Sequence, residues 1–325
     1  MPRLRRHKKL VVLLLALLPA LVVLVVRDRP IAEAAPHAVV SPTSTAARPS
    51  LQACWVELAR NEANGQVATA GLTRTRTWDI TVSGLLVRHP KGDLVIDVGN
   101  SSMFTAEIAD YPFLDRKWLE LIPGSNRVVA TAPDALRALG VSLDALTVLP
   151  THAHVDHLGG IVDLPLARVL LPQEELDWAH EHTHDRSVHV VAAHARALEG
   201  RVTPLVFAAR PYEIFDESAD LFGDGSVVVV KLFGHTPGSV GVFVNVSPER
   251  RMFHVGDAVN VVEAVDRRLT KSVVMASTDQ SRDGADRTVA RIAQLHDAEP
   301  GVAILPAHDR AAWARAFGQP GHCVR

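Results

Sequence analysis

The chain is poor in aromatic residues and has no excess of either charge. Phe, Trp and Tyr make up 5% of its 325 residues, and the formal net charge is −2. Proteins that bind nucleic acids usually carry a basic surface, and those that bind single strands add aromatic rings on which bases stack. The composition therefore argues against a nucleic-acid partner. It is 47% hydrophobic, which is enough for a sizeable core.

Cysteine is almost absent as well. The two cysteines, Cys54 and Cys323, lie near opposite ends of the part expected to fold, and neither belongs to a metal-binding motif. In an oxidising compartment they can form a disulfide, and in a reducing one they stay free thiols. The sequence does not give their separation in space, so both alternatives remain open.

One long hydrophobic run occurs, at residues 10–26. It is long for the core of a signal peptide and slightly short for a membrane-spanning helix, and Ala32-Glu33-Ala34 offers a cleavage site. Residues 1–30 are therefore predicted to be a signal peptide or a membrane anchor. Basic residues precede the run and should stay in the cytoplasm, so the rest is expected to be extracytoplasmic: secreted, periplasmic or anchored by a single pass. These residues are Arg3, Arg5, Arg6, Lys8 and Lys9.

Residues 31–50 are rich in Ala, Pro, Ser and Thr and are predicted to be a flexible linker. Residues 51–325 form the expected folded domain, which becomes rich in strand patterns from Val67 onward. Composition and pattern alone predict a mixed α and β domain. The expected strands are 79–88, 94–98, 146–149, 168–171, 227–232, 240–246, 251–255 and 302–305, and the main helices are 133–139, 172–180, 282–296 and 311–317.

Four potential metal ligands fall within six residues of the stretch Thr-His-Ala-His-Val-Asp-His-Leu-Gly-Gly, at 151–160. They follow the expected strand 146–149, so they lie on the turn that leaves a buried strand. His152 and His154 are two residues apart and point the same way in an extended segment. Asp156 and His157 follow the turn and can face a second metal. Imidazole and carboxylate ligands without thiolate suit zinc, with iron, manganese or cobalt as alternatives.

The pattern H-x-H-x-D-H followed by Leu-Gly-Gly resembles the metallo-β-lactamase superfamily of metal-dependent hydrolases. The resemblance implies an αββα sandwich, and a His, an acidic residue and a His further along the chain. The sequence offers His235 in Gly-His-Thr-Pro-Gly-Ser, Asp257 in His-Val-Gly-Asp and His308 in Leu-Pro-Ala-His-Asp. Each of the three follows an apolar run.

The same resemblance implies two zinc ions and a role for each ligand. One ion would be held by His152, His154 and His235, and the other by Asp156, His157 and His308. Asp257 and a hydroxide would bridge the two ions, and the hydroxide would attack a carbonyl. Asp156 would then carry a proton to the leaving group. No nucleophile-elbow motif for a serine hydrolase is present.

The identities of the expected ligands narrow the range of reactions and substrate classes. An acidic bridge at Asp257 disfavours β-lactam hydrolysis, and a histidine at position 154 disfavours the oxygen-reducing diiron branch. The full set resembles the N-acyl homoserine lactonase and glyoxalase II branches, and residues 88–97 look like the start of the lactonases. Those lactonases place a Tyr three residues after the bridging Asp, where this chain has Asn260, whose amide can still donate a hydrogen bond to an oxyanion.

The expected activity is therefore hydrolysis of a small-molecule lactone or ester. A thioester hydrolase of the glyoxalase II type and a phosphodiesterase are the enzymatic alternatives, because two metals serve these reactions equally well. The alternative from another class is a membrane-tethered metal-binding protein without turnover. If residues 1–30 are not cleaved, they would bring the protein into contact with a membrane.

Two further features have competing interpretations. Asp97 lies at the end of the expected strand 94–98 and is predicted to close a turn, with a hydrogen bond to a ligating histidine as the alternative. Five histidines gather between Trp178 and His194, where a solvated helical insertion is expected and a third metal site is the alternative. They are His180, His182, His184, His189 and His194.

Overall fold

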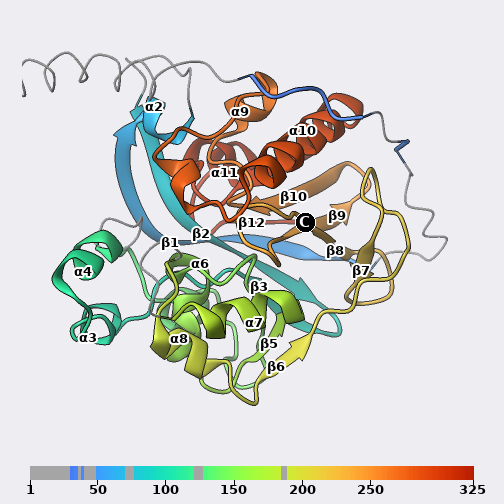
Figure 1. Ribbon diagram of the computed structural model, residues 1–325. Helices are drawn as coiled ribbons and strands as arrows, with labels where there is room; N and C mark the ends of the chain where they lie inside the picture. The colour runs from blue at the N-terminus through green and yellow to red at the C-terminus, as the bar shows by residue number, and fades with distance from the viewer. Residues whose placement is uncertain (1–29, 36–37, 40–48, 70–76, 121–126, 184–188) are drawn as a thin grey trace, which may run out of the picture.

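Two β-sheets pack face to face at the centre of the computed structural model, with helices on the outer side of each sheet (Figure 1). The structure describes residues 30–35, 38–39, 49–69, 77–120, 127–183 and 189–325. This is the mixed α and β architecture with two sheets that the sequence predicts.

The first sheet has seven strands in the order β12-β1-β2-β3-β4-β5-β6. Neighbouring strands in this sheet are antiparallel from β12 to β3 and parallel from β3 to β6. The strands are β1 (Gln52–Asn64), β2 (Thr77–His89), β3 (Gly92–Ile96), β4 (Thr147–Leu149), β5 (Arg168–Leu171), β6 (Val202–Pro204) and β12 (Cys323–Val324).

The second sheet has five strands in the order β11-β10-β9-β8-β7, and only the β10–β11 pair is parallel. The strands are β7 (Ser218–Asp220), β8 (Val227–Lys231), β9 (Val240–Ser247), β10 (Arg250–Gly256) and β11 (Val302–Pro306). Parallel neighbours in both sheets matter for the site, since the carboxyl ends of such strands meet at one edge.

Alternating side chains of the strands divide the hydrophobic core into layers. Val227 and Val229 point into the cluster between the two sheets, whereas Val228 and Val230 point outward, against α10 (Arg282–Ala298). Successive residues of a strand face opposite sides of a sheet. The continuous valine run of β8 is explained by burial on both faces.

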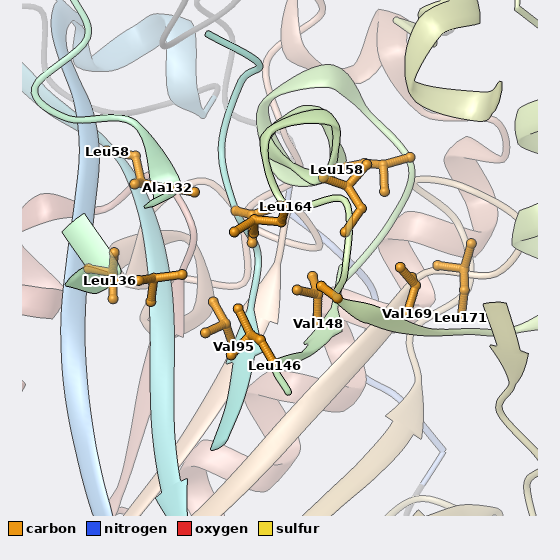
Figure 2. Close-up of a cluster of buried hydrophobic side chains, with 14 of the residues drawn as sticks. Leu58, Val95, Ala132, Leu136, Leu146, Val148, Leu158, Leu164, Val169 and Leu171 are labelled. Carbon is orange, nitrogen blue, oxygen red and sulfur yellow. The ribbon is translucent and has the colours of Figure 1, made fainter. Parts of the chain in front are cut away.

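Helices cover the outer face of the first sheet and pack on its apolar side chains. In Figure 2, Leu136, Leu158 and Leu164 lie against Val95 and Val148 of the sheet. The helical elements from α2 to α8 are α2 (Gly65–Ala68), α3 (Phe104–Glu107), α4 (Phe113–Leu119), α5 (Ala132–Ala138), α6 (Val155–Leu158), the 3₁₀ helix η1 (Gly159–Asp163), α7 (Gln173–Glu181) and α8 (Ala192–Ala197). The second half adds α9 (Val262–Asp266), the 3₁₀ helix η2 (Met275–Thr278) and α11 (Arg310–Phe317).

Strand β1 corrects the expectation that the strand pattern begins only after Val67. Its apolar side chains are interrupted by Glu57 and Arg60, which obscure the alternation. Glu57 is nevertheless buried, because its carboxylate accepts hydrogen bonds from Arg60 and Arg310. Neutralisation by Arg310, which is 253 positions further along the chain, leaves no pattern in the local sequence.

The hydrophobic run and the basic residues before it lie outside the described residues, so the signal peptide or anchor stays a prediction. In the part of the chain that is described, no helix has the length and apolar character to cross a membrane. The described part of residues 31–50 does make contacts with the folded domain. The Ile31 amide donates to the Arg268 carbonyl. Ile31 and Val39 also pack against the hydrophobic cluster between the second sheet and α10.

A disulfide joins Cys54 of β1 to Cys323 of β12, which decides between the two alternatives for these residues. The two cysteines are directly opposite each other in the antiparallel pair, and 269 positions of sequence separate them. The bond therefore closes a loop that contains almost the whole domain.

Replacing both cysteines by serine should lower the free energy of unfolding by about 3–5 kcal/mol, because the unfolded chain loses the constraint of a very long loop. Denaturant unfolding of the variant and the oxidised protein measures the difference. Reducing the unmodified protein is the control and should produce the same loss. Equal unfolding midpoints for all three samples would show that the bond contributes nothing.

Candidate metal centre

The seven predicted ligands come together at the carboxyl ends of four strands. The loop and helix after β4 carry His152, His154, Asp156 and His157, and all seven side chains are buried. The remaining three follow other strands: His235 lies beyond β8, Asp257 directly after β10 and His308 shortly after β11. Because β10 and β11 are parallel, Asp257 and His308 leave the second sheet at the same edge.

Three imidazoles form the first half of the centre, here called the three-histidine group: His152, His154 and His235. The Nδ1 atom of His154 lies 3.0 Å from Nε2 of His152 and 3.0 Å from Nε2 of His235. Three ring nitrogens therefore converge on one point, as in a site that holds a cation.

The second half, here called the Asp156 group, contains Asp156, His157 and His308. The Asp156 carboxylate lies 3.3 Å from Nε2 of His308 and 3.9 Å from Nε2 of His157. The ligand atoms of this group also converge closely enough to hold one ion.

Asp257 stands between the two groups and faces both. Its Oδ1 lies 3.3 Å from Nε2 of His157 and 3.2 Å from Nε2 of His308. Its Oδ2 lies 3.7 Å from Nε2 of His235. One carboxylate oxygen is thus directed at each group, which is the geometry of a bridging ligand.

The chemistry of these donors fits divalent cations. Burial, together with the neighbouring imidazoles, holds the pKa of His152 and His154 well below the usual value, so both rings are neutral and present lone pairs. Nε2 of His157 and Oδ1 of Asp257 are buried and have no hydrogen-bond partner among the described residues. Zinc needs neutral imidazole and ionised carboxylate in this way.

The Asp156 group is the more negative half. Burial opposes protonation of His308, yet Asp257 and Asp156 raise its pKa to about 10. Burial likewise opposes protonation of His157, but Asp97, Asp257 and Asp156 raise its pKa well above the usual value. A field that attracts a proton so strongly also attracts a divalent cation, with which the proton competes.

Asp97 corrects the expectation that it merely closes a turn. It is buried after β3 with a φ of 58°, and its carboxylate accepts hydrogen bonds from the backbone and side chain of Thr151 at 2.6 and 3.0 Å. It also lies 2.9 Å from Nδ1 of His157. A carboxylate in this position fixes the tautomer and the ring orientation of a ligating histidine.

Other ligand rings are oriented in the same manner. Nδ1 of His308 donates to the Thr81 carbonyl at 2.8 Å, and Nδ1 of His235 lies 2.8 Å from Asp279. Asp279 was not recognised in the sequence, because an Asp in a short polar segment between two helical elements looks like an ordinary loop residue.

Glu175 connects the two loops that carry the three-histidine group. Its carboxylate accepts the Ala153 amide at 2.7 Å and the Gly238 amide at 2.8 Å. Burial raises its pKa to about 7, against the effect of these donors. The sequence does not reveal this role, because an acidic residue in the first turn of a helix is common for reasons of the helix dipole alone.

Asn260, three residues after Asp257, is buried, and its Nδ2 donates to the Ala68 carbonyl at 2.9 Å. One of its two amide hydrogens is therefore engaged by the protein, and the predicted contact with an oxyanion would use the other. That role stays a prediction.

The histidine-rich insertion is only partly solvated, which corrects the expectation for two of its members. His194 is buried against Glu107 at 2.9 Å, and His189 is buried beside the ring of His154, with ring centroids 5.5 Å apart. His180 is exposed, and His184 lies outside the described residues. Within the described ranges, the groups of side chains able to hold a metal all belong to the centre above, and none includes these histidines.

Comparison with known proteins identifies the family of the chain. The family model of the metallo-beta-lactamase superfamily matches residues 76–308. The N-acyl homoserine lactonase AttM of Rhizobium radiobacter is 24% identical over 260 residues, which cover 73% of this chain and 85% of that protein. The probable metallo-hydrolase Rv2300c of Mycobacterium tuberculosis is 29% identical over 189 residues, covering 55% and 60%.

Solved structures share the fold. An N-acyl homoserine lactone hydrolase with N-hexanoyl-L-homoserine bound at its catalytic metal centre superimposes with a TM-score of 0.59 at 16% identity, covering 82% of this chain and 98% of that one. The dizinc lactonase AidC gives a TM-score of 0.55 at 16% identity, covering 88% and 91%. With a family match over more than two thirds of its length, the chain belongs to the metallo-beta-lactamase superfamily.

Proposed function

We propose that the protein is a dinuclear metal-dependent hydrolase that opens a lactone or cleaves a similar ester. The observation that carries this proposal is the position of Asp257, whose two oxygens face the three-histidine group and the Asp156 group separately. A carboxylate shared in this way supports a pair of cations that act together on one substrate.

The substrate class is supported by the relatives. Those that cover most of the chain are named N-acyl homoserine lactonases, and a structural neighbour holds the ring-opened product N-hexanoyl-L-homoserine. N-acyl homoserine lactones are therefore the first substrates to test. We propose zinc as the metal, with iron, manganese and cobalt as alternatives that the same ligands accept.

Two bound cations would supply an activated water and polarise the carbonyl of the substrate. The chain supplies the remaining steps. Asp156 accepts the proton of the attacking water on its carboxylate and delivers it to the departing ring oxygen. The free amide hydrogen of Asn260 donates to the oxyanion that forms at the carbonyl carbon. Asp97 keeps the His157 ring in its tautomer throughout.

The purified protein should hydrolyse N-acyl homoserine lactones, and either chelation or His154→Ala should lower kcat/KM by at least about 100-fold, because an altered centre loses its metals. Turnover can be followed by the proton released on ring opening. His180→Ala is a matched control, since His180 is an exposed histidine of the neighbouring insertion, and should leave the rate unchanged.

A panel of lactones, thioesters and phosphodiesters separates the proposal from its alternatives. Faster hydrolysis of a thioester or a phosphodiester than of any lactone would show that the protein is a thioester hydrolase or a phosphodiesterase instead. Stoichiometric zinc without turnover of any of the three would identify a metal-binding protein instead.

Asp97→Asn should weaken zinc binding by about 10- to 100-fold, since the amide cannot hold His157 as a carboxylate does. Competition with a chromophoric chelator measures the affinity. Asp93→Asn removes the same charge from a partly exposed position in β3, the strand that precedes Asp97, and should bind zinc as the unmodified protein does. Equal affinities for both variants would limit Asp97 to a role in the turn.

We also propose that the protein works outside the cytoplasm. The Cys54–Cys323 disulfide supports an oxidising compartment, in keeping with the hydrophobic run at residues 10–26. Protein recovered from cells after rapid thiol blocking should contain no blocked cysteine, and its N-terminal mass should show whether the leader is cleaved. Two blocked cysteines in a cytoplasmic fraction would contradict this location.

A further inference from the structure

A buried lysine lies behind one of the metal ligands. Lys271 is 4% exposed and belongs to the segment between α9 and η2. Its Nζ lies 2.5 Å from Oδ1 of Asp279 and 3.1 Å from Nδ1 of His235. Lysine is rarely buried in this way unless it is paired, and here its partner is the carboxylate that orients a ligand.

The tautomer of His235 decides how these three groups are bonded. Its Nε2 faces the centre and must be unprotonated to bind a cation, so Nδ1 carries the hydrogen. Nδ1 therefore donates to Asp279, 2.8 Å away, and so does the ammonium of Lys271. Both donors use the same oxygen, Oδ1, and the contact between Nζ and Nδ1 is a repulsive one between two donors.

The corresponding carboxylate in the other half of the centre has no such neutralising charge. Asp97 binds His157 and Thr151, and no lysine or arginine among the described residues pairs with it. Its other ionisable neighbour is His254, 3.6 Å away, whose pKa burial lowers to about 4, so this ring is neutral. Asp97 thus presents its full negative charge behind His157, whereas Asp279 shares its charge with an ammonium.

The ligands themselves add to this difference. The three-histidine group contributes neutral imidazoles and shares Asp257, whereas the Asp156 group has a carboxylate of its own and shares Asp257 as well. Opposite charges inside a protein interact far more strongly than they do in water. The two positions should therefore hold a divalent cation with unequal strength.

We propose that Lys271 is a positioning residue that weakens the hold of the three-histidine group on its cation, so that the Asp156 group fills first and the three-histidine group second. The proposal rests on the dinuclear centre put forward above. Under this proposal the cation of the three-histidine group is the exchangeable one. It is also the stronger electron acceptor, because His235 donates less charge to it.

Metal-free, oxidised protein titrated with zinc against a chromophoric chelator tests the proposal, and native mass spectrometry counts the ions bound at each step. The unmodified protein should show two constants, with the second equivalent at least about tenfold weaker. Lys271→Met should tighten the second equivalent by about 10- to 100-fold and leave the first unchanged, because Asp279 then acts on His235 with its full charge. Lys271→Arg keeps the charge and should retain the original order.

The direction of this effect separates electrostatics from damage to the structure. A residue that only supports the fold would weaken metal binding when it is replaced, whereas Lys271→Met is expected to strengthen it. Lys117→Met removes a positive charge from an exposed position on α4 and is the matched control, with both constants unchanged. Asp279→Asn leaves the ammonium in place and should weaken the second equivalent.

Two equal constants in the unmodified protein would overturn the proposal, and so would weaker or uniformly altered binding in Lys271→Met. If Lys271→Met does not fold, Asp279→Asn decides, and unchanged binding there overturns it. The titration involves no turnover. A protein that fails to hydrolyse lactones can therefore still pass it, and an active lactonase with two equal constants would refute the role of Lys271 alone.

Discussion

Seven side chains whose donor atoms carry unshared electron pairs lie together in one buried volume, and the surrounding structure holds them there. A ring nitrogen of His154 lies 3.0 Å from a ring nitrogen of His152 and of His235, although nitrogens that bind a cation have no hydrogen to share with one another. Left to themselves these groups would separate or take up protons. Strand ends from both sheets and a hydrogen bond behind several of the rings oppose that separation, and bound cations remove its cause.

Charge is distributed unevenly around this convergence. The Asp156 group is surrounded by Asp97 and Asp257, which raise the pKa of His157 even though burial opposes protonation. The three-histidine group has Lys271 behind it instead. This uneven charge is the basis of the proposal that the two halves have separate tasks. Under it, one half would hold its cation firmly as part of the structure, and the other would keep its cation available to the substrate.

The sequence predicts those parts of the centre that are local or that follow buried strands. The pattern from His152 to His157 is of this kind, and the family resemblance that it carries pointed to the single residues His235, Asp257 and His308 after later apolar runs. Asp279, Lys271 and Glu175 were not, because each acts through a contact between segments distant in the chain and looks like an ordinary surface or capping residue. Asp97 was assigned the wrong role for a related reason: a turn and a buried carboxylate have the same local sequence. Strand β1 was missed because Glu57 is neutralised by Arg310, more than 250 positions away.

The disulfide bears on the centre as well as on stability. Cys54 precedes Trp55, whose ring stacks on Trp313 of α11, and this helix begins just after His308. The backbone carbonyl of His308 accepts a hydrogen bond from Trp78 of β2, and its ring is held by Thr81 of the same strand. The disulfide thus lies at the same edge of the first sheet as the side chains that pack around His308 and fix its position. The disulfide and the last ligand of the Asp156 group are therefore connected through the same packing, which is formed by β1, β2 and α11.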